Sequence, residues 1–296
     1  MIIERANAKI NLFLSVGDKR PDGYHDLASA MHTLSLCDTL SLDYTPGEFT
    51  RIRLEISGGG DLPCDCRNLA YRAAEAFLAA TGRRGEVGIR LSKRIPMAAG
   101  LGGGSADAAA VLRGLNRLCG SPLSKEELCT LGAGLGADVP FCVLGGCALA
   151  EGVGEKLTPI PTLPQDAVFV VACGGEGVST KEAYGMIDAK REDNALFRVP
   201  EKEPFTDAIA QGDPALVLPY LFNDFESVIE PLRPTVTEIK KVMRDLGATF
   251  SMMSGSGPAV FGIFSNLQAG DAACSSLSIH GIPAFLCHPT KAYSFD

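Results

Sequence analysis

The chain has 296 residues, of which 46% are hydrophobic and 21% charged, and this composition predicts a soluble globular protein of one large domain or two ordinary ones. Its formal net charge of -8 argues against a general nucleic-acid-binding surface. No apolar run approaches the length of a membrane span, so no membrane partner is expected.

The N-terminal segment is predicted to form a half-buried strand over residues 8–16. Its side chains alternate, with Ala8, Ile10, Leu12, Leu14 and Val16 on one face and Lys9, Asn11, Phe13 and Ser15 on the other. Lys9 and Asn11 would therefore project from the same face, about 7 Å apart. Residues 1–5 lack the basic and apolar regions of a signal peptide, which favours a cytoplasmic protein, and look like the start of a strand.

Helices and strands are both expected along the middle of the chain. Up to residue 118 the sequence predicts, in order, a turn at 19–23, a helix at 67–81 stopped by Gly82, a strand at 87–91 and a helix at 106–118. Between the last strand and helix lies a segment rich in glycine and alanine. Ser124 and Glu127 have the spacing of a capping box for a further helix, which glycines 132, 134 and 136 should end before Asp138.

The C-terminal half continues this mixture. Residues 158–164 are rich in proline and are expected to connect two domains. Capping boxes are predicted at Ser179 with Glu182 and at Thr235 with Glu238, and strands at 168–172, 249–254 and 259–264. Because strands and helices do not alternate strictly, the α+β class is favoured over a doubly wound sheet.

The ten cysteines are scattered, and many have apolar neighbours. This pattern predicts reduced, buried thiols in a cytoplasmic protein. The only close pair is Cys64 and Cys66, which is not a CxxC and has no second pair or histidine at metal-ligand spacing. A plain loop is favoured there over a metal or redox site.

The glycine-rich segment before residue 106 is the most informative one. A strand, a glycine-rich loop and a helix in succession can surround a phosphate, because backbone amides and the helix N-terminus present unpaired donors. A Walker A loop is excluded, because the chain has no Gly-Lys dipeptide. A dinucleotide fingerprint is also excluded, because Ser105 stands where its third glycine is needed. A flexible surface loop without a ligand is the alternative.

Three segments together resemble the GHMP kinase superfamily. Residues 96–110 are similar to its central phosphate-binding motif, residues 8–12 to its N-terminal motif, and residues 253–258 to its C-terminal glycine motif. The three occur in the family's order and span nearly the whole chain. The resemblance implies a two-lobed α+β fold, with an ATP-binding lobe at residues 1–160 and a ferredoxin-like lobe at 161–296.

Within the superfamily, the chain resembles the diphosphocytidyl-methylerythritol kinases. The matching segments are residues 20–25 (Arg-Pro-Asp-Gly-Tyr-His), 136–141 and 145–155. The resemblance implies transfer of the γ-phosphoryl group of ATP to the 2-hydroxyl of a small-molecule substrate that carries a cytidyl diphosphate group. Magnesium would be carried with the nucleotide, since no protein metal cage is apparent.

The resemblance also assigns site residues. Lys9 and Asp138 would be catalytic. From residue type alone, Lys9 could instead be a solvated charge on a strand, and Asp138 could be a helix N-cap. The residues expected to bind ATP are Pro96, Met97, Ala98, Ala99, Gly100, Leu101, Gly102, Gly103, Gly104, Ser105, Ala106 and Asn68. Those expected to bind the substrate are Asn11, Tyr24, His25, Thr180 and Tyr184, with the two tyrosines sandwiching the cytosine and His25 bonding its edge.

Two other functions stay open. One is a GHMP kinase that acts on homoserine, mevalonate or a sugar, and the other is a GHMP-fold protein that binds without catalysis.

Asn223-Asp224-Phe225-Glu226 resembles a further family segment, but no chemistry is assigned to it. His32, His280 and His288 are interpreted as structural or surface residues.

Overall fold

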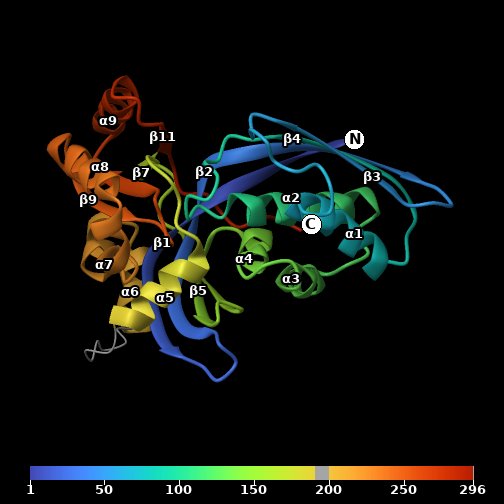
Figure 1. Cartoon of the computed structure of the whole chain (residues 1–296), viewed down its shortest axis with the longest axis horizontal. Coiled ribbons are helices and arrows are strands. Elements are labelled where there is room, and N and C mark those ends of the chain that lie inside the picture. The colour runs from blue at the N-terminus through green and yellow to red at the C-terminus, as the bar shows by residue number, and fades with distance from the viewer. Residues whose placement is uncertain (191–199, 296) are drawn as a thin grey trace.

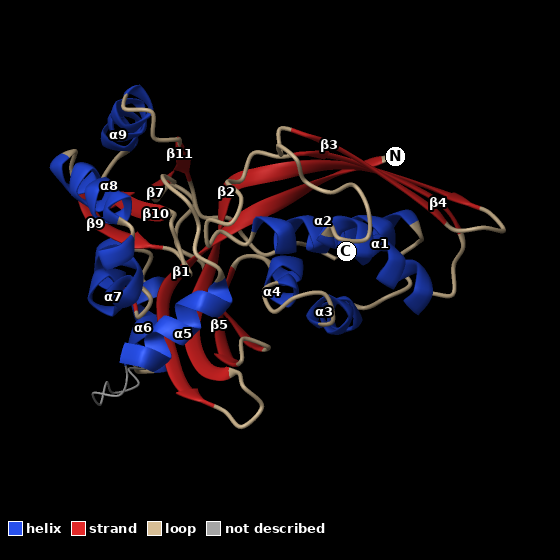
Figure 2. Ribbon diagram, viewed as in Figure 1, coloured by secondary structure: helices blue, strands red, loops and turns tan. Residues whose placement is uncertain are grey.

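The computed structural model describes residues 1–190 and 200–295 (Figure 1). Within these residues the strands form two sheets, of seven and four strands (Figure 2). The larger sheet contains β1 (Ile2–Lys19), β2 (His25–Pro46), β3 (Arg51–Ser57), β4 (Gly85–Ser92), β5 (Cys147–Gly152), β6 (Lys156–Ile160) and β8 (Phe222–Asn223). The smaller contains β7 (Val168–Ala172), β9 (Ala248–Met253), β10 (Val260–Phe264) and β11 (Ala284–Cys287). The α+β class is confirmed.

The helices form two groups along the chain. Helices α1 (Leu69–Ala80), α2 (Gly103–Leu118), α3 (Lys125–Ala133) and α4 (Val139–Leu144) gather beside the larger sheet (Figure 1). The others are α5 (Thr180–Lys190), α6 (Lys202–Ala210), α7 (Glu226–Ile229), α8 (Pro234–Asp245) and α9 (Leu267–Ile279). Helices α8 and α9 pack on one face of the smaller sheet, and none of the described helices is long and apolar enough to cross a membrane.

Strand β1 joins the two halves of the molecule. In the larger sheet the strands run in the order β3-β4-β2-β1-β8, and β5 pairs with β2 and β6. Ala8, Ile10 and Leu12 of β1 share a hydrophobic core with Phe169 and Phe261 of the smaller sheet. The end of the chain returns to the larger sheet, where Leu34 of β2 forms a bridge with Pro289. The division at residue 160 stays a prediction.

The expectation that β1 is half-buried is wrong. The face that carries Lys9, Asn11 and Ser15 is buried as well, although these side chains are polar. The glycine-rich loop supplies part of the cover, because the Lys9 amide donates to Leu101 O at 2.9 Å. The predicted common face of Lys9 and Asn11 is confirmed: their side chains are joined by a hydrogen bond of 2.8 Å from Nζ to Oδ1.

The helix predictions around the glycine-rich loop are largely confirmed. Helix α1 lies within the predicted range and is followed by Gly82, which has a left-handed φ of 62°. The Ser124–Glu127 capping box is present at the start of α3. Helix α2 begins at Gly103, three residues before the predicted start at 106, because the loop itself turns into the helix after the left-handed Gly102, with φ 68°.

Two predictions in the C-terminal half need correction. Thr235 and Glu238 form no capping box, because Pro234 is the first residue of α8 and Thr235 already lies inside the helix. Residues 158–160 belong to β6, which pairs with β5, so the connection between the sheets begins only after Ile160. The strand at 168–172, the β9–β10 pair and the Ser179–Glu182 box are confirmed.

All ten cysteines are free, but only four are buried. Cys64 and Cys66 are exposed and lie in a loop, as predicted for this pair, whereas the general expectation of buried thiols fails for six of the ten. Among residues 1–190 and 200–295, no group of three histidine, cysteine or acidic side chains could hold a metal ion. His32 is buried and His280 exposed, as their structural or surface interpretation predicted.

Candidate active site

A cavity of about 1230 Å³ lies between the glycine-rich loop, β1 and helix α5. The predicted site residues that line it are Lys9, Asn11, Tyr24, His25, Asn68, Pro96, Met97, Ala98, Ala99, Gly100, Leu101, Gly102, Gly103, Gly104, Ser105, Asp138, Thr180 and Tyr184. Ala106 is the exception, because its side chain is buried inside the molecule. The structure therefore brings almost the whole predicted set to one cavity.

The glycine-rich loop presents unpaired backbone donors to this cavity. Gly102 caps helix α2 without a side-chain bond, so the amides of the first turn have no intrahelical partner. A helix N-terminus of this kind favours anions. A Cβ on Gly102 would lie 2.9 Å from Lys9 Cγ, so the glycine also lets Lys9 pass close to the loop. The loop can hold phosphate groups beside the Lys9 ammonium.

Lys9 and Asp138 are close together at the base of the loop. The distance from Lys9 Nζ to Asp138 Oδ2 is 3.4 Å, and the side chains are 6% and 37% exposed. Asn11 Nδ2 donates to Ser29 Oγ at 2.8 Å, so Asn11 is itself held where it accepts from Lys9. Burial excludes a solvated Lys9. Asp138 precedes α4 but its side chain makes no cap bond, so its carboxylate is available to a ligand.

Aromatic rings also line the cavity. The rings of His25 and Tyr184 stack with centroids 4.8 Å apart, and His25 Nε2 lies 2.6 Å from Asp188 Oδ1. Burial raises the pKa of Tyr184 to about 12. Tyr24 is 65% exposed, and the ring stacked on Tyr184 is that of His25 instead. This arrangement can receive a flat, polar ring at the mouth of the cavity.

The C-terminal glycine segment completes the cavity. Gly255 and Ser256 line it, and Thr180 Oγ1 lies 3.4 Å from Ser256 Oγ. Ser254 Oγ donates to Gly100 O at 3.1 Å. The two glycine segments, which are more than 150 positions apart in the chain, are therefore in direct contact.

Sequence reasoning missed a buried ionic group in the same cavity. Lys93 Nζ bonds Asp107 Oδ2 at 2.7 Å and also the carboxylate of Asp38, which is fully buried. Burial raises the pKa of Asp107 to about 8. One signal was visible: Asp107 is an acidic residue among alanines, on the face of a helix that otherwise reads as core.

Comparisons with known proteins identify the family of this chain. Residues 68–146 match the model of the GHMP kinases N terminal domain, and residues 205–282 that of the GHMP kinases C terminal domain. Two similar proteins are both called 4-diphosphocytidyl-2-C-methyl-D-erythritol kinase. The protein from Bacillus velezensis is 45% identical over 88% of each chain. The protein from Alkaliphilus metalliredigens is 40% identical over 93% of this chain and 92% of its own.

A solved structure is similar over the whole length. It is a crystal structure of 4-(cytidine 5'-diphospho)-2C-methyl-D-erythritol kinase, with a TM-score of 0.81 and 38% identity. The match covers 97% of this chain and 99% of that one. Both halves of the fold, and the cavity between them, therefore fall within the likeness.

Proposed function

We propose that this chain, which belongs to the GHMP kinase family, transfers the γ-phosphoryl group of ATP to the 2-hydroxyl of 4-diphosphocytidyl-2-C-methyl-D-erythritol. The products are ADP and the 2-phosphate, on the route to isoprenoid precursors. The observation that carries the proposal is the Lys9–Asp138 pair, 3.4 Å apart beside the glycine-rich loop. The names and coverage of the relatives support the choice of substrate.

In the proposed mechanism Asp138 accepts the proton of the substrate hydroxyl. Its carboxylate is partly exposed to the cavity, where a hydroxyl can reach it. Lys9 stabilises negative charge that develops on the attacking oxygen and the transferred group. The first-turn amides of α2 hold the phosphates, so that most of the catalysis is positioning and charge stabilisation.

Magnesium fits this site as an ion carried by the nucleotide. The cavity lining offers the Ser105 hydroxyl, a hard oxygen ligand of the kind magnesium prefers. The described residues hold no cluster of three ligands that would bind it alone. When bound, the ion would neutralise phosphate charge.

The substrate's cytosine is assigned to the aromatic rings of the cavity. Tyr184 offers a ring face and His25 a polar edge, while the exposed Tyr24 can cover the base from the other side. Asn11 and Thr180 also line the cavity and are assigned to the substrate's hydroxyl and diphosphate oxygens. Asn68 is assigned to the nucleotide, although it also caps α1 by accepting from the Ala70 amide.

We also assign ATP binding to residues 1–160 and closure of the substrate cleft to residues 161–296. A cytoplasmic location fits the ten free cysteines, because thiols persist in a reducing compartment.

A coupled assay of ADP release with a panel of alcohols tests the function. We expect turnover with the cytidyl substrate and none with homoserine or mevalonate. Turnover of either of those alone would assign the chain to another GHMP kinase activity. Nucleotide binding without turnover of any alcohol would favour a binding protein.

A further inference from the structure

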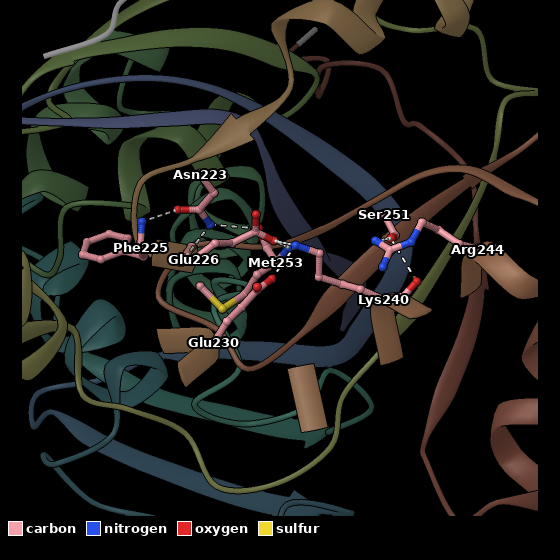
Figure 3. Close-up of polar contacts among 9 residues, drawn as sticks. Asn223, Phe225, Glu226, Glu230, Lys240, Arg244, Ser251 and Met253 are labelled. Carbon is pink, nitrogen blue, oxygen red and sulfur yellow. Dashed lines mark hydrogen bonds and ion pairs between the residues drawn. The ribbon is translucent and has the colours of Figure 1, made fainter. Parts of the chain in front are cut away.

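The four residues at 223–226, to which the sequence assigned no chemistry, contact three different parts of the molecule. Asp224 accepts the Val16 amide of β1 at 2.8 Å, and the Phe225 ring meets Tyr184 edge-on at 5.1 Å. Asn223 and Glu226 both bind the end of β9, as Figure 3 shows. A segment with so many partners can fix the relative positions of the walls of the active site.

Asn223 holds the turn that follows β9. Its Nδ2 donates to Met253 O and to Gly255 O, both at 2.8 Å, and its Oδ1 accepts the Phe225 amide at 3.0 Å (Figure 3). The residue is 6% exposed. Both N–H donors of this buried amide are used within the protein, and both bonds go to backbone carbonyls at the end of β9 and in the turn that follows it.

Glu226 holds the same turn from a second direction. Its Oε1 accepts the Met253 amide and the Lys240 ammonium, each at 2.7 Å (Figure 3). Lys240 also pairs with Glu230, so its one positive charge is shared between two carboxylates. Side chains from residues 223–226 therefore fix both the N–H and the C=O of Met253.

The turn in question packs directly against the glycine-rich loop. Besides the Ser254–Gly100 bond, the Ala259 amide donates to Ala99 O at 3.1 Å. A Cβ on Gly100 would lie 2.1 Å from Ser254 O, and a Cβ on Gly255 would lie 3.0 Å from Gly100 O. The backbone of the turn is in close van der Waals contact with the backbone of the glycine-rich loop, so a displacement of the turn must also displace the loop.

We propose that Asn223 is a positioning residue for phosphoryl transfer, acting through the 254–257 turn on the Gly100 loop. The proposal rests on the proposed kinase function. Its amide keeps the turn against the loop, so the loop amides stay aimed at the phosphates near Lys9. The same segment reaches Tyr184 through Phe225, so Asn223 ties the nucleotide side of the cavity to the substrate side.

A buried asparagine can also serve stability alone, and Asn116 provides the matched control. It is 4% exposed, donates to Leu123 O at 2.9 Å and accepts the Leu123 amide at 3.0 Å. It lies near the C-terminal end of α2, away from the residues that line the cavity. Asn116→Asp removes a buried amide donor as Asn223→Asp does, but without touching the turn.

The experiment compares Asn223→Asp and Asn116→Asp with the wild type. Thermal melting, binding of a non-hydrolysable ATP analogue, and KM and kcat for both substrates are measured. In Asn223→Asp a carboxylate oxygen replaces the donor that faces two carbonyls, so we expect the turn to move. A misplacement of about 1 Å can cost roughly a hundredfold in rate, so we expect kcat/KM for ATP to fall about tenfold or more.

Both variants should melt at lower temperature, but only Asn223→Asp should weaken the ATP analogue and lower kcat. The proposal is overturned if Asn223→Asp keeps wild-type kinetics, or if Asn116→Asp loses as much kcat/KM for ATP. If Asn223→Asp does not fold, the smaller, uncharged Asn223→Ser replaces it, with the same two outcomes. A wild type inactive on the cytidyl substrate would instead refute the proposed function, and analogue binding would still test Asn223.

Discussion

Replacing Asp138 by Asn should nearly abolish turnover while leaving nucleotide binding intact. The change keeps the shape of the side chain but removes the proton acceptor. Lys9 stays in place, because its ammonium is also held by Asn11 at 2.8 Å. A general base contributes roughly 10²–10⁴ in rate, so we expect kcat to fall about a thousandfold. That loss corresponds to about 4 kcal/mol in the activation barrier.

The assay is ADP release with the cytidyl substrate, paired with calorimetric titration of an ATP analogue. Asp207→Asn is the control, because Asp207 is an exposed carboxylate on α6 outside the cavity lining. We expect wild-type kinetics for the control and an ATP-analogue affinity within about threefold of wild type for Asp138→Asn. A kcat of Asp138→Asn within about tenfold of wild type would remove Asp138 as the base. A collapse of analogue binding would assign Asp138 to the nucleotide instead.

Three further predictions concern the walls of the cavity. Tyr24→Ala should raise KM for the cytidyl substrate with little change in KM for ATP; the reverse pattern in steady-state kinetics would contradict the cytosine assignment. Gly100→Ala should lower the melting temperature and ATP affinity far more than Gly120→Ala, because both have φ near 80° but only the Cβ at Gly100 meets backbone, at 2.1 Å; equal losses would mean that strain, not contact, dominates. Burial raises the pKa of Asp107 from 3.8 to about 8, so the folded state binds this proton more tightly than the unfolded state does. The free energy of unfolding should therefore fall as the pH rises from about 4 to about 8. Denaturant titrations across this pH range should show a smaller loss of unfolding free energy in Asp107→Asn than in the wild type. An equal loss in both proteins would show that Asp107 does not cause the pH dependence.

Sequence patterns predicted helices and strands well where the residues that determine the element are close together in the chain. The alternation at residues 8–16 predicted a strand, and Gly82 ended α1 where it was expected to. The Thr235 box failed because a stronger local signal, Pro234 at the first helical position, moved the start of the helix. Competing signals within one turn of a helix cannot be ranked from spacing alone.

Long-range partners were beyond the reach of those patterns. Lys9 and Asp138 are brought together from opposite ends of the N-terminal half, and only their resemblance to family motifs nominated them. Nothing near Asn223 in the sequence shows that it binds the turn after β9, about 30 positions later. Nor does spacing reveal that Asp38 and Asp107 share Lys93. Such contacts are set by the tertiary packing of elements that lie far apart in the chain.

The one clear failure about β1 lies at the site itself, and there is a physical reason for this. A half-buried strand would leave Lys9 in water, where its charge is hydrated and screened and acts weakly on a phosphate. The fold instead covers this face with the glycine-rich loop, so the Lys9 side chain is only 6% exposed while its partner Asp138 keeps 37%. Asn11 and Asp138 compensate the cost of burying the ammonium. The alternation of side chains predicts that this polar face of β1 is exposed, whereas the proposed chemistry needs it covered. A functional site is where such a local prediction is expected to fail.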